Sequence, residues 1–261
     1  MQLANIKESS CERMSDSRAT FRDRRSVQFR SALVSRMINI PWKFLCATAA
    51  LGLLFVICPS LDLQASSLFY QHGHFFLAKN PLVKFVYHAV PVLVVLYALF
   101  ILGGLAVLCC GRRRTICGLS RKAFLYLLLA FALGPGLMVN TVLKGHVGRA
   151  RPMQVVQFGG SKRFTPAFVL SDQTKPNGSF VSGHASVGFS IVALSLLLCR
   201  RRRRQVLAAA IAFGGVVGLA RMAQGKHFLS DIIFAFVFVY LVSYLLHEIM
   251  FHKERLSREV V

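Results

Sequence analysis

The sequence has too few polar residues to cover the surface of a soluble protein of its length. Of its 261 residues, 55% are hydrophobic and only 16% are charged. This composition leaves little room for a water-soluble domain with its own polar surface. A soluble globular protein is therefore excluded, and the chain is predicted to be an integral membrane protein.

Acidic residues are also scarce, with 10 Asp and Glu against 32 Lys and Arg and a formal net charge of +22. In a soluble protein this balance would favour nucleic-acid binding. Here most of the basic residues flank apolar runs or lie in one loop that we expect on the outer face. Contacts with the membrane and with an anionic ligand account for them, and no nucleic-acid partner is predicted.

Cysteines are missing from the three loops expected on the outer side of the membrane, residues 62–84, 144–179 and 221–231. Five of the seven cysteines lie in or at the ends of apolar runs, and Cys11 and Cys117 are expected in the cytoplasm. No disulfide framework is therefore predicted.

Six apolar runs are the predicted membrane spans, because roughly 20 apolar residues cross a bilayer as a helix. The last two runs are somewhat short, and snorkelling Lys and Arg side chains would extend them. The predicted fold class is all-α, an integral-membrane bundle of six helices over residues 44–61, 85–110, 123–143, 180–199, 205–220 and 232–247.

Basic residues cluster before the first run, at alternate loops and after the last run, in residues 22–43, 112–122, 200–204 and 253–258. Short basic loops stay on the cytoplasmic side, so both termini are predicted to be cytoplasmic. Residues 1–42 form a cytoplasmic segment, disordered and then amphipathic, residues 43–251 the six-helix domain, and residues 252–261 a cytoplasmic tail.

Three short polar stretches then share the outer face: Lys144-Gly-His-Val-Gly-Arg-Ala-Arg151-Pro152, Val181-Ser182-Gly183-His184, and Arg221-Met-Ala-Gln-Gly-Lys-His227-Phe-Leu-Ser-Asp231. The loop at 144–179 carries six Lys and Arg against the single acidic residue Asp172. Such cations suit either anionic lipid headgroups or a phosphate pocket, for which Arg offers a bidentate fork.

Ser182-Gly183-His184 opens the fourth predicted helix, where free backbone N–H groups favour an anion. Gly183 permits close approach, and His184 can transfer a proton near neutral pH or act merely as a cap. His227 and Asp231 are four residues apart, so on a helix the carboxylate can orient the imidazole as a nucleophile. The alternative is an ion pair of Asp231 with Arg221 or Lys226.

The order Lys-x6-Arg-Pro, Ser-Gly-His and Arg-x5-His-x3-Asp resembles the signature of the type 2 phosphatidic acid phosphatase superfamily, which includes membrane lipid phosphatases and soluble vanadium haloperoxidases. Six apolar runs favour the membrane enzymes. Two positions depart from the commonest pattern, Val181 for Pro and Ala220 for Ser, and neither removes a catalytic side chain.

The resemblance implies that His227 is the nucleophile forming a phosphohistidine, that Asp231 orients it, and that His184 is the general acid and base. It implies that the phosphoryl oxygens are held by Lys144, Arg151, Ser182, Gly183 and Arg221. No metal and no cofactor are implied, because three fixed cations neutralise the phosphoryl charge.

Residues 158–168 and 177–184 resemble the bacterial lipid A phosphatases of this superfamily. We therefore expect a phosphatase in the bacterial inner membrane, with a periplasmic active site that removes the 1- or 4'-phosphate of lipid A. Undecaprenyl pyrophosphate, phosphatidylglycerophosphate and phosphatidate are alternative substrates, and the sequence leaves the oligomeric state open. Phosphotransfer to another lipid, and a carrier without catalysis that binds anionic lipids, are alternative functions.

Overall fold

The computed structural model describes residues 42–259 apart from 112 and 175–176, with side chains described up to His252. The predicted disordered and amphipathic segment therefore lies outside the described residues, except for Trp42. The side chains of the predicted tail lie outside them as well, apart from His252.

The described chain is mostly helical, as predicted. Its α-helices are α2 (Trp42–Ile57), α3 (Ser60–Ser67), α4 (Pro81–Cys110), α5 (Arg121–Phe131), α6 (Lys144–His146), α7 (Gly183–Phe189), α8 (Val192–Leu196), α9 (Arg200–Ala223) and α10 (Leu229–Glu259). A π-helix, η1 (Ala132–Leu143), joins α5 to α6, and two 3₁₀ turns, η2 (Pro152–Gln154) and η3 (Val156–Phe158), lie in the long loop that follows.

Two small antiparallel hairpins depart from an all-α fold. Strands β1 (Tyr70–Gln71) and β2 (His74–Phe75) pair with Tyr70 opposite Phe75. Strands β3 (Thr115–Ile116) and β4 (Leu119–Ser120) pair with Thr115 opposite Ser120. Each hairpin closes a loop between helices and leaves the helical architecture unchanged.

Each of the six apolar runs overlaps a helix, but only four described helices are long and apolar enough to span a membrane: Pro81–Cys110, Arg121–His146, Arg200–Ala223 and Leu229–His252. Helices α2 and α3 make a fifth candidate if they form one span, bent by 80°. The stretch Gly183–Leu196 is shorter, about 21 Å at about 1.5 Å per residue, against a bilayer core of about 30 Å.

The fourth apolar run thus forms the shortest helical segment, whereas the sequence led us to expect that the fifth and sixth spans would be short. Helix α9 extends to 24 residues and α10 to 31 because their flanking Arg and Lys residues continue the helix. Charged side chains at a helix end can reach water, so basic flanks need not terminate a span.

Local signals explain where helices begin and bend. Helix α4 starts after Asn80, whose side chain accepts hydrogen bonds from the backbone N–H of Leu82 (2.9 Å) and Val83 (3.4 Å). The π-helix η1 contains Pro135, which has no N–H for the helical ladder and displaces the preceding turn. Pro59 lies at the bend between α2 and α3.

Glycines let the helices that carry the polar stretches approach closely. A Cβ added to Gly188 of α7 would lie 2.8 Å from the Cα atom of Gly214 in α9, so only small residues fit there. This contact sets the start of α7 near the end of α9. The Ser182-Gly183-His184 stretch therefore lies close to Arg221.

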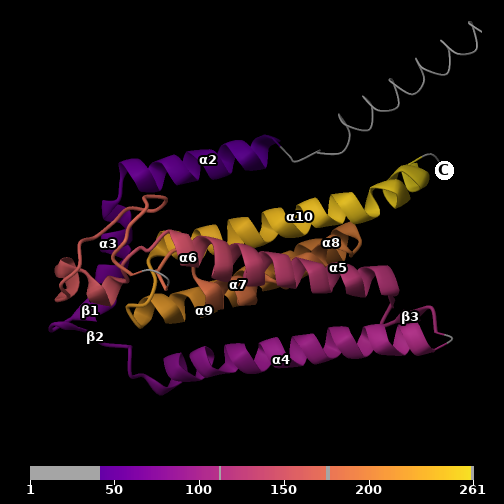
Figure 1. Ribbon diagram of the computed structural model, residues 1–261, viewed down its shortest axis with the longest axis horizontal. Helices are drawn as coiled ribbons and strands as arrows, with labels where there is room; N and C mark the ends of the chain where they lie inside the picture. Colours follow the sequence, from indigo (N-terminus) through magenta and orange to yellow (C-terminus); the bar gives the residue numbers. More distant parts are fainter. Residues whose placement is uncertain (1–41, 112, 175–176, 260–261) are drawn as a thin grey trace, which may run out of the picture.

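Figure 1 shows α5, α9 and α10 side by side, with α2 and α4 along opposite sides. Helices α3 and α6 and the hairpin β1–β2 gather at one end, and β3 lies near the other end, as does the end of α10. Large hydrophobic side chains of α4 remain exposed, among them Leu82, Phe85, Leu96 and Leu99. Such a surface suits contact with lipid.

Candidate active site

A cavity of about 720 Å³ brings together residues from all three polar stretches. Five of the eight predicted site residues line it: Lys144, Arg151, His184, Arg221 and His227. They come from α6, the loop after it, the first turn of α7, the last turn of α9 and the loop before α10. Side chains far apart in the sequence thus share one cavity at the α3–α6 end of the molecule.

The other three predicted residues, Ser182, Gly183 and Asp231, are buried behind the cavity. The Ser182 side-chain oxygen caps α7 by accepting from the N–H of Ala185 (3.4 Å), which leaves its own hydroxyl hydrogen free to donate elsewhere. A Cβ at position 183 would collide with the side-chain oxygen of Asn140. Only glycine fits this position without a shift of Asn140.

The ring of His227 is almost completely buried, and its Nδ1 lies 2.9 Å from the Ser179 carbonyl oxygen. A carbonyl can only accept, so Nδ1 carries the proton and Nε2 has a free lone pair. Burial lowers the pKa of His227, an effect that Asp231 opposes. The imidazole is therefore held in the neutral form that a nucleophile requires.

Asp231 contacts His227 less directly than the sequence suggested, because a backbone carbonyl is closer to the imidazole. Its carboxylate is 3.5 Å from the His227 Nδ1 atom, whereas the Ser179 carbonyl makes the shorter contact. The same carboxylate accepts hydrogen bonds from the Ser179 hydroxyl and from the Phe228 N–H (2.7 Å) at the start of α10. It thus fixes both segments that flank the imidazole.

The ion-pair partner of Asp231 is Arg149, at 2.7 Å, and not Arg221 or Lys226. Arg149 also pairs with Asp62 at 2.7 Å, and all three side chains are fully buried. The Arg149 Nε atom donates to the Thr165 carbonyl (2.7 Å). Arg149 therefore joins α3, the long loop and the first turn of α10.

This cluster is not predicted from the sequence, where Arg149 is one of six cations in its loop and Asp62 belongs to none of the three polar stretches. One signal was present, because Asp62 is one of only ten acidic residues and directly follows an apolar run. Buried acidic residues at such positions usually have a charged partner.

The Arg221 side chain makes one hydrogen bond and one ring contact, and one of its N–H donors has no partner among the described residues. Its Nη1 donates to the Gln224 side chain, and its guanidinium lies 4.7 Å from the centre of the Tyr87 ring. That ring also stacks on His184, with centres 4.9 Å apart. The buried Nε of Arg221 has no hydrogen-bond partner in the described part of the chain. Native structures rarely leave such a donor unused unless a ligand or water completes it.

Lys84 and Lys226 add positive charge to the cavity beyond the predicted residues, and the His88 ring also lines it. None of the described residues that line the cavity is acidic. Burial, together with Arg151 and Arg221, lowers the pKa of Lys226. No group of three or more His, Cys, Asp or Glu with a geometry for metal binding occurs among residues 42–252 that the structure describes.

The model of the PAP2 superfamily matches residues 123–255, which include all three polar stretches, so the chain belongs to this superfamily. It is a membrane phosphatase of this superfamily, as its apolar helices and cationic cavity led us to expect. No solved structure shows significant similarity to the chain.

The chain is 37% identical over 209 residues to the lipid A 4'-phosphatase of Francisella tularensis subsp. novicida, an alignment that covers 77% of this chain and 91% of that protein. It is 39% identical over 101 residues to the lipid A 4'-phosphatase of Rhizobium leguminosarum, covering 39% and 43% of the two chains. Its identity to the Rhizobium etli enzyme of the same name is 36% over 103 residues, covering 40% of each chain.

Proposed function

We propose that this protein hydrolyses the 4'-phosphate of lipid A through a phosphohistidine on His227, without a metal ion. The cavity that joins His184 and His227 to three signature cations is the observation that carries the proposal. The similarity to a lipid A 4'-phosphatase over 91% of its length supports the substrate.

In the first step, the Nε2 atom of His227 attacks phosphorus and the bond between phosphorus and the sugar oxygen breaks. His184, protonated once the anionic phosphate lies beside it, gives its proton to the leaving alkoxide. Lys144, Arg151 and Arg221, with the Ser182 hydroxyl and the Gly183 N–H, hold the phosphoryl oxygens. The unused Nε donor of Arg221 suits this task.

In the second step, His184 takes a proton from water, whose oxygen attacks the phosphohistidine. The phosphorus–nitrogen bond breaks, inorganic phosphate leaves and His227 is regenerated. Ser179 and Asp231 keep the His227 ring in one tautomer and one position throughout, through the contacts described above.

The charge of the cavity favours a substrate with more than one anionic group. Five Lys and Arg residues line the cavity, whereas a phosphomonoester carries a charge of about −2 at neutral pH. Lys84 and Lys226 are not among the signature residues assigned to the phosphoryl group, and they remain for a second anion. Lipid A with phosphates on both sugars offers one, and phosphatidate does not.

The test is an assay of the purified protein with lipid A that carries both phosphates. We expect mass spectrometry to detect loss of one HPO₃ unit from the 4' position, with inorganic phosphate released in the presence of EDTA and with inhibition by vanadate. Intact lipid A alongside rapid hydrolysis of phosphatidate or undecaprenyl pyrophosphate would contradict the substrate. Transfer of the group to a second lipid would replace hydrolysis by phosphotransfer.

A variant in the same assay tests the contribution of the additional cations. Lys226→Ala should raise KM for lipid A several-fold and leave kcat nearly unchanged, because a contact with the second anion of the substrate binds substrate and transition state alike. Lys79→Ala removes the same charge outside this cavity and serves as the control. Equal KM values for both variants would show that Lys226 does not recognise the substrate.

We further propose that the chain crosses the bacterial inner membrane six times, with α2–α3 and α7–α8 as irregular spans, cytoplasmic termini and a periplasmic active site. Arg121, Lys122 and residues 200–204 lie at the starts of α5 and α9, opposite the cavity, which supports this orientation. In a background without native cysteines, Ser171→Cys should react with an impermeant maleimide in intact spheroplasts, and Gly111→Cys only after permeabilisation. The reverse pattern would place the cavity in the cytoplasm.

A further inference from the structure

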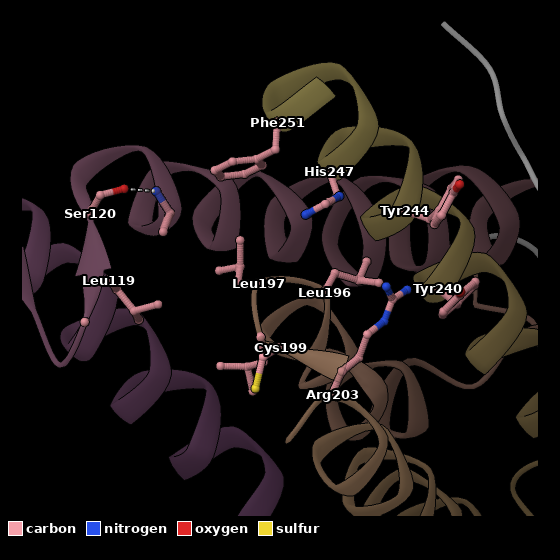
Figure 2. Close-up of a pocket in the computed structure, with 13 residues that line it drawn as sticks. Leu119, Ser120, Leu196, Leu197, Cys199, Arg203, Tyr240, Tyr244, His247 and Phe251 are labelled. Carbon is pink, nitrogen blue, oxygen red and sulfur yellow. Dashed lines mark hydrogen bonds between the residues drawn. The ribbon is translucent and has the colours of Figure 1, made fainter. Parts of the chain in front are cut away.

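A second cavity, of about 660 Å³, lies at the other end of the helices. The cavity is surrounded by the β3–β4 hairpin, the start of α5, the connection from α8 to α9 and the middle of α10 (Figure 2). Along α9, the backbone from Arg203 in this cavity to Arg221 in the candidate active site spans roughly 27 Å at about 1.5 Å per residue. The two cavities are therefore separate sites.

Arg203 is the cation of this second cavity. It belongs to five consecutive arginines, of which Arg200, Arg201, Arg202 and Arg204 are exposed while Arg203 is half-buried and lines the cavity. Figure 2 shows its guanidinium between Leu196 and Tyr240. The exposed neighbours suit the membrane surface, but the inward position of Arg203 needs another explanation.

The backbone N–H of Arg203 donates to the Cys199 carbonyl (2.8 Å), but no hydrogen bond or ion pair links its guanidinium to another residue within the described part of the chain. A guanidinium carries five N–H donors, and a bound anion could accept several of them at once. None of the described residues lining the cavity is acidic. Among the described residues no acidic side chain complements the charge of Arg203, so an anionic ligand suits this site.

The remaining walls indicate what kind of anion fits. Hydroxyl and imidazole groups of Tyr240, Tyr244 and His247 lie on the α10 side of the cavity, and Leu196, Leu197 and Phe251 give it apolar walls. A small inorganic anion would use the polar groups but leave the apolar walls unfilled. A phosphate attached to acyl chains would contact both.

We propose that this cavity binds an anionic phospholipid, with Arg203 contacting the headgroup phosphate and the Leu and Phe side chains contacting its acyl region. Helices α5, α9 and α10, which enclose the cavity, also lead to Lys144, Arg221 and Asp231 at the other end. A lipid bound between them stabilises their packing, because a ligand that binds only the folded state raises its stability.

The test uses the full-length protein purified in a mild detergent. Native mass spectrometry should detect a retained phosphatidylglycerol molecule, and after the lipid has been stripped, added phosphatidylglycerol should raise the melting temperature more than phosphatidylcholine does. Arg203→Gln should weaken this binding about tenfold or more, an effect of about 1.4 kcal/mol. Arg202→Gln, which removes the same charge from an exposed neighbour, should leave it nearly unchanged.

Leu197→Trp fills the cavity without changing a charge and should also abolish retention, while phosphatase activity in each variant reports that the protein is folded. Equal losses in Arg202→Gln and Arg203→Gln would overturn the proposal in favour of general attraction to the arginine run. So would equal binding of phosphatidylcholine. Full displacement of the lipid by inorganic phosphate would show a site for a small anion instead.

Discussion

Replacing His227 with alanine is expected to reduce hydrolysis of lipid A by several orders of magnitude while the protein still folds. The substitution removes the proposed nucleophile, and members of a cooperative catalytic unit are costly to lose singly. Released phosphate, measured with purified protein, gives the comparison. His146→Ala is the matched control, because this histidine is exposed and lies outside the cavity.

The role of His184 can be separated from that of His227 by the choice of leaving group. A phosphate ester of an acidic phenol needs no proton on its leaving oxygen, so His184→Ala should form the phosphohistidine from it at a nearly normal rate. His227→Ala should form none with any ester. A His227→Ala protein that retains a tenth of wild-type hydrolysis would refute the nucleophile assignment.

Replacing Arg149 with leucine is expected to lower the free energy of unfolding by about 3–5 kcal/mol, the usual cost of breaking a fully buried ion pair. The change leaves Asp62 and Asp231 as buried carboxylates without their cation. Thermal unfolding in detergent, followed by the fraction of monodisperse protein, measures the loss. Activity should fall as well, because Asp231 and Ser179 position His227.

Arg151→Leu provides the contrast, because Arg151 lies two positions further on, is only partly buried and lines the cavity. We expect it to unfold near the wild-type temperature and yet to lose most of its activity. The two variants together distinguish a cation that holds the fold from a cation that holds the phosphate. If Arg149→Leu unfolded at the wild-type temperature, the buried ion pair would contribute no net stability.

Much of the site could be predicted because its signals are local. Short motifs such as Ser182-Gly183-His184 keep their spacing whatever the rest of the fold does, and apolar runs long enough to cross a bilayer predict helices without knowledge of their neighbours. The alternation of basic loops then places all three motifs at one end. These inferences needed no tertiary contact.

The roles of the individual arginines could not be predicted in this way. Arg149 and Arg151 are the same residue type in the same motif, yet the first is fully buried between two carboxylates and the second lines the cavity. Their difference depends on Asp62 and Asp231, which lie 87 and 82 positions away from Arg149. No local pattern encodes a pairing over that distance.

The sequence by itself determined that this chain is a helical membrane protein of the PAP2 superfamily, because composition, apolar runs and motif spacing are properties of the chain alone. Only the tertiary structure decided that the fourth apolar run folds as a short helix, that Ser179 lies between Asp231 and His227, and that Arg203 turns into a second cavity. Each of these depends on which surfaces pack together, and packing brings together groups that are distant in the chain.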